Sequence, residues 1–432
     1  MNSRDRQAPP SSVAELVRHE ADPLPPRVGL VRIGLALTAS QTAVYVTLNA
    51  VVAVLLPVKI VQVVGETHKE SWLGIISSAG AVVSILAGPV IGSLSDRTRH
   101  RLGRRAPWLL AGGAGSVVAF GAVGLAPGPV PLLLASCLSQ LTVALVLTPI
   151  NTVLPERVPL SRRGTISGVT GLATTIAAAS AGWAGAAFVD DPALGTTLLG
   201  ALVLVGTVAF VLLAPERSSS VDAPPQRAVG RQPLMSRSMF ASFSDHNFRW
   251  VCVGRLLVVM AYQVLQARML YFVKDRFDLS LRSAATTVGS VTAIAGVLTV
   301  IGLVASGPLS DRFGRRPFVC FGSAGVGLGL LLVTQVSSVS QFIAAWAVAS
   351  LAFGSFVGVD GALTADVLPA ADSVGRDLGV VGLAQTLPQT VAPALGSAVL
   401  AATGSSYTIL LVGGAISGFA AVGATLRLRG VR

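Results

Sequence analysis

The stretch GSLSDRTRHRLGRRAP occupies residues 92–107, and it returns as GPLSDRFGRRP at residues 307–317. The shared residues keep an offset of 215 before a four-residue insertion in the first copy and of 211 after it. The tripeptide GLA at residues 171–173 recurs at residues 382–384, again with an offset of 211. The chain therefore contains two copies of one half-length unit.

The composition is that of a membrane protein. Of 432 residues, 52% are hydrophobic and only 12% are charged, and the mean hydropathy is +0.71. A soluble domain carries roughly a quarter charged residues, so a water-soluble enzyme is disfavoured. The three cysteines and four histidines show no metal-binding spacing, and they predict neither a disulfide framework nor a metal site.

Apolar windows long enough to cross about 30 Å of hydrocarbon recur about twelve times along the chain. We therefore expect an all-α membrane protein with twelve transmembrane helices. The expected spans are residues 33–58, 73–94, 108–126, 130–154, 166–189, 195–214, 250–273, 284–306, 318–335, 341–365, 379–402 and 406–426. Six spans in each copy is an even number, so both copies enter the membrane in the same direction, as a parallel repeat of two six-helix bundles.

The polar segments divide the chain into five parts. A proline-rich polar tail, which lacks the apolar core of a signal peptide, comes first, and one long polar segment separates the sixth span from the seventh. The expected parts are a disordered tail at 1–30, an N-terminal bundle at 31–214, a linker at 215–248, a C-terminal bundle at 249–427 and a tail at 428–432.

Basic residues predict the orientation, because Lys and Arg accumulate in cytoplasmic loops. Of the 32 Lys and Arg residues, five lie on odd-numbered connections and two within span seven, which leaves 25 on the tails and even-numbered connections. We therefore expect both termini in the cytoplasm of a cell-membrane protein. The net charge of +12 then faces anionic lipid headgroups, and nucleic-acid binding is disfavoured because no basic stretch is interleaved with aromatics.

The GxLSDRxGRR pattern of both copies resembles the major facilitator superfamily of secondary transporters, which carries this loop between the second and third helix of each half. The resemblance extends over residues 32–429. The longer first copy, SDRTRHRLGRRAP, is similar to the glycoside-pentoside-hexuronide and sucrose-type transporters, which have a similarly extended loop. The resemblance implies alternating access, in which two bundles rock about a central site, and we expect a monomer.

The repeated loop is a candidate conformational gate. Asp96 and Asp311 stand where a span meets the predicted cytoplasmic surface, flanked by arginines that fit charge-assisted bonds between helices. The resemblance implies that this loop stabilises the outward-open state; the alternative is that its arginines only set topology and bind lipid headgroups. The candidate gate residues are Gly92, Asp96, Arg97, Gly103, Arg104, Arg105, Gly307, Asp311, Arg312, Gly314, Arg315 and Arg316.

The connections after spans four and ten are candidates for a second pair of gates. Glu156 with Arg162 or Arg163 is the expected ion pair in the first connection. Asp366 with Arg376 is the expected pair in the second, although an ordinary solvated loop explains either segment nearly as well.

Polar residues inside spans cost free energy to desolvate, so they usually face a cavity or a partner. Gln41, Tyr45 and Asn49 are spaced i, i+4, i+8 on one face of span one. The resemblance implies that spans one, four, seven and ten line the cavity; the alternative for any single side chain is a helix–helix hydrogen bond. The candidate substrate-binding residues are Gln41, Tyr45, Asn49, Gln140, Asn151, Tyr262, Gln266, Gln385 and Gln389.

Arg255 in span seven and Asp360 in span ten both lie roughly 10 Å inside the membrane at 1.5 Å per residue. We expect a buried ion pair between them, because an unpaired charge at that depth costs more than a paired one. Such a carboxylate can exchange its partner for a proton, which makes this pair the candidate for proton coupling. The alternatives are a static pair that holds the C-terminal half together, and side chains that snorkel to the inner membrane surface.

The leading prediction is a proton-coupled transporter of a small, polar, sugar-like solute, with substrate, protons and membrane lipids as partners and no cofactor. The alternative is drug or metabolite efflux by proton antiport, because much of the remaining lining is apolar. A receptor or scaffold that transports nothing is the third possibility. No Walker A sequence occurs, so ATP is not expected to drive the process directly.

Overall fold

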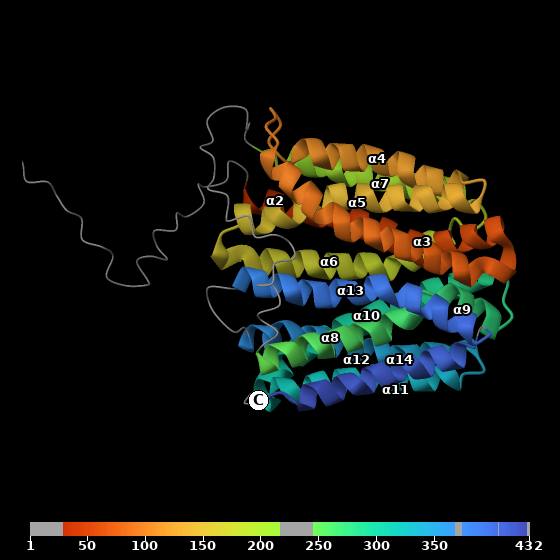
Figure 1. Cartoon of the computed structure of the whole chain (residues 1–432). Coiled ribbons are helices and arrows are strands. Elements are labelled where there is room, and N and C mark those ends of the chain that lie inside the picture. The colour runs from red at the N-terminus through yellow and green to blue at the C-terminus, as the bar shows by residue number, and fades with distance from the viewer. Residues whose placement is uncertain (1–28, 217–244, 368–373, 405, 430–432) are drawn as a thin grey trace, which may run out of the picture.

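A computed structural model of the chain describes residues 29–216, 245–367, 374–404 and 406–429. The predicted N-terminal tail and central linker lie almost entirely outside these residues, and so do residues 430–432 of the predicted C-terminal tail. In the described part, every regular element is a helix, and the helices run side by side along the long direction of the molecule (Figure 1).

The helices match the predicted spans closely. Their bounds are α2 (Leu30–Ala50), η1 (Val51–Leu55, one π-helical segment), α3 (Leu56–Arg97), α4 (Ala106–Leu125), α5 (Pro129–Arg157), α6 (Leu160–Ala186), α7 (Pro192–Leu213), α8 (His246–Gln266), α9 (Met269–Arg276), α10 (Leu281–Phe313), α11 (Arg315–Thr334), α12 (Val339–Asp366), α13 (Val374–Ala402) and α14 (Tyr407–Leu426).

Nine segments of the described residues are long and apolar enough to cross a membrane. The first, Leu30–Arg97, has 68 residues and bends sharply at Gly65, so it supplies two spans. Helices α6 and α13, with 27 and 29 residues, are also long enough to cross. The nine segments supply ten spans, and α6 and α13 bring the total to the predicted twelve; α9 continues the span of α8. The all-α membrane fold is confirmed.

The helices form two bundles. Helices α2 to α7 pack mainly on one another and form the N-half, whereas α8 to α14 form the C-half. Figure 1 shows the N-half in red to yellow-green and the C-half in green to blue. The halves meet where α6 packs against α10 and where α3 packs against α13.

Small residues allow close approach at the seam between α6 and α10. A Cβ atom added to Gly182 would lie 2.7 Å from the Cα atom of Gly289, closer than real Cβ atoms come. Glycine pairs of this kind let membrane helices pack backbone to backbone.

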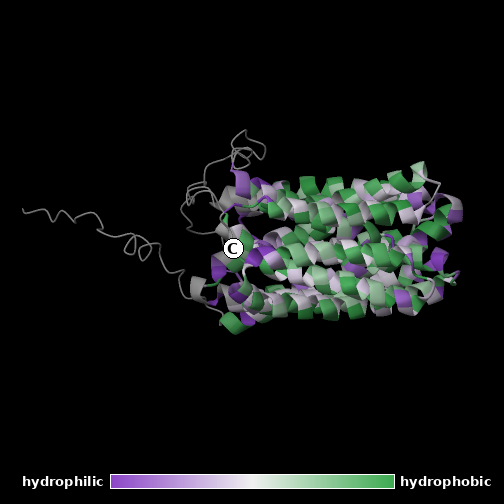
Figure 2. Cartoon of the chain, turned by 90° about the horizontal axis from the view of Figure 1, so that it is seen from below, coloured by the Kyte–Doolittle hydropathy of each residue, from purple (hydrophilic) through white to green (hydrophobic). Residues whose placement is uncertain are grey.

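The two ends of the bundle differ in charge. We call the end that carries both arginine-rich turns, together with the starts of α2 and α6, the basic end, and the other the opposite end. Hydrophilic residues gather at both ends, and apolar residues cover the length between them (Figure 2). In the two repeated turns, Gly103 has φ of +94° and Gly314 has φ of +92°, a backbone conformation that glycine adopts without strain.

Two segments differ from the predicted element bounds. The predicted connection between spans one and two is helical almost throughout, and Gly65, with φ of 74°, makes the bend. The predicted seventh span is interrupted between Gln266 and Met269, where Arg268 departs from helical geometry. Arg268 is completely buried, and its side chain bonds to the opposite half, which explains the break.

Candidate functional site

The opposite end of the molecule is closed by contacts between the halves. Within the described residues, each ion pair that joins the two halves lies at this end. Lys69 Nζ lies 2.6 Å from Asp275 Oδ1, and Lys274 Nζ lies 2.7 Å from Glu66 Oε1. The Tyr271 hydroxyl also donates to the Pro57 carbonyl at 3.0 Å.

Glu70 is the centre of this closure. Arg268 Nε donates to Glu70 Oε2 at 3.1 Å, and the Tyr407 hydroxyl donates to Oε1 at 2.5 Å. Arg268 also donates to Ser397 Oγ at 2.5 Å and to the Pro393 carbonyl. Ser397 Oγ in turn donates to the Glu70 carbonyl at 2.7 Å. These residues, which we call the Glu70 cluster, connect α3 of the N-half to α13, α14 and the break between α8 and α9 of the C-half.

The charged groups around Glu66 and Lys69, in the connection between the first two spans, reinforce one another. Burial raises the pKa of Glu66, but hydrogen bonds from Lys274 and Lys69 outweigh it and hold the pKa below its ordinary value. Burial lowers the pKa of Lys69, but hydrogen bonds to Asp275 and Glu66 outweigh it and hold the pKa above its ordinary value. Both groups are therefore charged at neutral pH.

At the basic end, no ion pair between described residues joins the two halves. Asp96 and Asp311, the predicted gate carboxylates, are exposed and form no ion pair within the described residues. Arg97 and Arg312 beside them are exposed as well. The ion pairs between the halves among the described residues therefore lie at the opposite end, and the predicted gate carboxylates of the repeated loops take part in none of them.

The equivalent arginines Arg104 and Arg315 of the two repeats each form a bond within their own half. Arg104 pairs with Glu156 at 2.5 Å in the N-half, whereas Arg315 donates to the Ala362 carbonyl at 3.0 Å in the C-half. Arg316 donates to the Leu426 carbonyl. Gly92 and Gly307 are half-buried.

The predicted ion pair between Glu156 and Arg162 is wrong. Glu156 pairs with Arg104 and Arg105 of the repeated loop, and not with Arg162; the side chain of Arg163, the other predicted partner, lies outside the described part. Arg105 is 1% exposed, and its burial requires a carboxylate partner that the exposed Arg162 does not need. The second predicted pair, between Asp366 and Arg376, involves side chains outside the described part.

A polar pocket lies between α2, α5 and α6 of the N-half, towards the basic end. Gln41 Nε2 donates to Asn151 Oδ1 at 3.4 Å, and both residues line the pocket, whose volume is about 230 Å³. Thr170 and Ser167 add hydroxyls, and Leu37 is among the apolar lining residues. Two predicted substrate-binding residues are thus brought together.

The other predicted substrate-binding residues of the N-half do not line this pocket. Asn49 Nδ2 donates to the Tyr45 carbonyl of its own helix at 2.8 Å, and both side chains are half-buried. Gln140 Oε1 accepts from Ser84 Oγ at 3.2 Å, which is the helix–helix hydrogen bond expected as its alternative.

In the C-half, Tyr262 lies between two aromatic rings. Its ring stacks on Phe353, with centroids 4.1 Å apart, and on Trp346, with centroids 4.9 Å apart. The Tyr262 hydroxyl lies 3.4 Å from Ser350 Oγ. Gln266, one turn further along α8, has a buried Oε1 with no partner among the described residues. The side chains of Gln385 and Gln389 lie outside the described part.

Arg255 and Asp360 form the buried ion pair that the sequence predicts. Each residue is 6% exposed. The Arg255 guanidinium also donates to Thr364 Oγ1 at 2.8 Å and to the Val381 carbonyl at 3.3 Å, so it joins α8, α12 and α13. Arg255 lies nine residues from the start of α8, which is about 13 Å from the basic end.

Sequence reasoning missed the Glu70 cluster and the two rings beside Tyr262. Glu70 and Arg268 fall in different repeats, and only the relative placement of the halves brings them together. A signal for Trp346 and Phe353 exists, because with Ser350 they are spaced i, i+4, i+7 on one face of α12.

Within the described residues no cluster of His, Cys, Asp or Glu is arranged to hold a metal ion.

Comparison with protein families gives one match that covers most of the chain: residues 39–406 match the model of the MFS/sugar transport protein family. No curated protein sequence matches at a significant level.

Solved structures share the fold at low sequence identity. A mutant of the peptide transporter POT in complex with sulfate is 14% identical, with a TM-score of 0.71 over 94% of this chain and 95% of that one. The mutant nucleoside transporter NupG is 14% identical, with a TM-score of 0.67 over 92% and 98%. A bacterial homologue of the human lysosomal transporter Spinster, in an inward-facing, unoccupied conformation, is 15% identical, with a TM-score of 0.64 over 92% and 94%.

Proposed function

Because the chain belongs to the MFS/sugar transport protein family, we propose that it is a proton-coupled transporter that moves a small, polar, sugar-like solute by alternating access. Its class is that of a multi-pass membrane transporter rather than an enzyme. The family shows this class, whereas the identity of the solute and of the coupling ion is our proposal.

The lining of the N-half pocket supports a hydroxyl-rich solute. The amides of Gln41 and Asn151 and the hydroxyl of Thr170 offer both donors and acceptors, and none of the pocket-lining residues is charged. Neutral donors and acceptors suit a neutral polar ligand. Because a peptide transporter and a nucleoside transporter share this fold, the fold alone does not determine the solute.

The observation that carries the proton-coupling proposal is the buried pair between Arg255 and Asp360. The carboxylate has one charged partner, and Thr364 offers the arginine a second acceptor at 2.8 Å. When a conformational change draws Arg255 away, an ionised Asp360 is left unpaired at low dielectric, and binding a proton removes the cost. Asp360 would then carry the proton, and Arg255 would control when it binds.

We propose that the basic end faces the cytoplasm, as the distribution of Lys and Arg indicates. The structure then corresponds to an inward-facing state, with the Glu70 cluster as the closed outer gate. In the opposite state the repeated loops with Asp96 and Asp311 would close the basic end, while the Glu70 cluster separates.

The test uses the purified protein in liposomes, with radiolabelled candidate solutes and an imposed pH gradient. Asp360→Asn should abolish accumulation driven by the gradient while it spares exchange of solute between the two sides, because exchange needs no net proton movement. Asp278→Asn is the matched control, since Asp278 is exposed and its φ of 49° is one that Asn tolerates.

Full accumulation by Asp360→Asn would remove the coupling assignment. Transport of a sugar by the wild type that ignores the pH gradient would leave the solute class standing and remove proton coupling. Loss of both accumulation and exchange in Asp360→Asn, with a lowered melting temperature, would support the static alternative.

Efflux of an apolar compound is the second candidate, and the half-buried ring of Phe353 at the end of the aromatic stack favours it. Flat aromatic compounds stack on such faces. The same liposomes with a panel of lipophilic cations separate the two: proton-driven movement of the cations, without sugar flux, would select efflux.

A further inference from the structure

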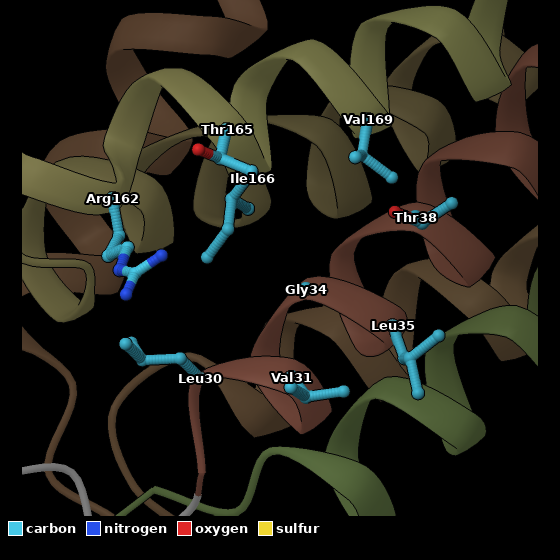
Figure 3. Close-up of a pocket in the computed structure, with 9 residues that line it drawn as sticks. All are labelled: Leu30, Val31, Gly34, Leu35, Thr38, Arg162, Thr165, Ile166 and Val169. Atoms are coloured by element: carbon cyan, nitrogen blue, oxygen red, sulfur yellow. The ribbon is translucent and has the colours of Figure 1, made fainter.

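An apolar groove lies between α2 and α6 at the basic end, with a volume of about 510 Å³. Figure 3 shows its two walls, one from each helix, with open space between them. Its lining residues are Leu30, Val31, Gly34, Leu35, Thr38, Arg162, Thr165, Ile166 and Val169.

The groove lies on the outer side of α6. At 100° per residue, its residues Arg162, Ile166 and Val169 point away from Ser167 and Gly171, which line the polar pocket. Val31 and Leu35 on α2 are 76% and 57% exposed. Large apolar side chains so exposed on a transmembrane helix are those that contact lipid, so the groove opens to the membrane and not to the solute cavity.

The end of the groove that reaches the membrane surface is positive. Arg162 is the one charged residue of the lining, and its guanidinium turns towards the groove in Figure 3. It forms no ion pair within the described residues. Helices α2 and α6 both begin at this rim, and neither has a side-chain cap, so free backbone N–H groups add positive potential.

We propose that this groove binds an anionic phospholipid of the leaflet at the basic end, with the phosphate at Arg162 and one acyl chain between α2 and α6. Arg162 and Val169 are seven residues apart on α6, so the apolar part reaches about 10 Å below the headgroup. Gly34 leaves room for the chain, because a Cβ atom there would meet only Ile166, at 3.9 Å.

Native mass spectrometry of the full-length protein in neutral detergent tests the headgroup. Phosphatidylglycerol and phosphatidylcholine with identical acyl chains are added in separate titrations. Because one basic residue near a membrane surface contributes about 1 kcal/mol, phosphatidylglycerol should bind about fivefold more tightly. Arg162→Gln should remove this preference. Arg249→Gln, an equal loss of charge at an exposed basic-end residue outside the groove, should keep it.

A second variant tests the acyl-chain site. Gly34→Leu fills the groove and should reduce the binding of both lipids, whereas Gly423→Leu, at an exposed helical glycine with open space around it, should not. The melting temperature in detergent checks that each variant folds.

Three results would overturn the proposal. Equal binding of the two lipids by the wild type would exclude a role for the anionic headgroup. Unchanged binding by Gly34→Leu would place the lipid elsewhere. Lipid binding that develops only after residues 1–28 are removed would identify that segment of the chain as the occupant. None of these results depends on which solute the protein transports.

Discussion

At the scale of single residues, buried arginines make the decisive connections. Arg105 and Arg268 are each 1% exposed and Arg255 is 6% exposed, and each has a carboxylate partner on another helix. Arg105 acts within the N-half and Arg255 within the C-half. Arg268 alone of the three joins the halves, so its partner Glu70 is the residue on which closure of the opposite end depends most.

Glu70→Ala should therefore open the opposite end. It leaves Arg268 buried without its carboxylate, and breaking a buried pair costs about 3–5 kcal/mol, whereas the separated halves would let Arg268 reach water. Spin labels at Pro127 of the N-half and Ser337 of the C-half, both exposed at this end, should move apart.

Asp190→Asn provides the control at the same end. It removes the ion pair of Asp190 with Arg282, whose side chains are 66% and 72% exposed. An exposed pair contributes at most about 1 kcal/mol, so the label distance should stay at its wild-type value. Equal shifts in the two variants would mean that the Glu70 cluster has no special role in closure.

At the scale of elements, the spans can be predicted from the sequence, while their interruptions cannot. A helix in lipid must satisfy its own backbone hydrogen bonds and expose apolar side chains, and both requirements are local. The break at Arg268 has a different cause, since the side chain leaves the helix line to reach Glu70 and Pro393 of other helices. For the bend at Gly65, the only local indication in the sequence is the glycine itself.

The same distinction separates the site residues. Gln41 and Asn151 are predictable from their position in the cavity-lining spans, and Arg255 and Asp360 from the cost of unpaired charge in a membrane. Glu70 lies at the end of a span, where a carboxylate is unremarkable. Its role in joining the halves depends on the packing of α3 against α13, which cannot be predicted from any single stretch of sequence.

The backbone of the first repeated turn predicts how a substitution there changes the stability of the N-half. Gly103→Ala should lower the melting temperature, because its φ of +94° strains any side chain and a Cβ atom would lie 2.2 Å from that of Glu216. The expected cost exceeds about 1 kcal/mol. Gly307→Ala, at a glycine with open space around it, should have little effect; an equal loss in both variants would contradict this explanation.

At the scale of the whole molecule, we propose that the structure is one of two states. Ion pairs between the halves gather at the opposite end, and the paired arginines of the basic end bond within their own halves. Each half has a largely separate packed core, although Val54, Val58 and Val189 of the N-half pack in that of the C-half and Tyr271 packs in that of the N-half. We therefore expect the halves to rotate as units about the seams of α6 with α10 and of α3 with α13. Alternating access at a central site is then a rearrangement of contacts at the two ends.

The most direct test measures two distances between the halves by electron paramagnetic resonance in one protein sample series. One label pair, Pro127 with Ser337, reports the opposite end, and a second, Arg101 with Phe313, reports the basic end; all four residues are exposed. Cys137, Cys252 and Cys320 are first replaced by serine. Changing pH or adding a transported solute should shorten one distance while the other lengthens. Distances that stay fixed, or that change in the same direction, would contradict alternating access by these two bundles.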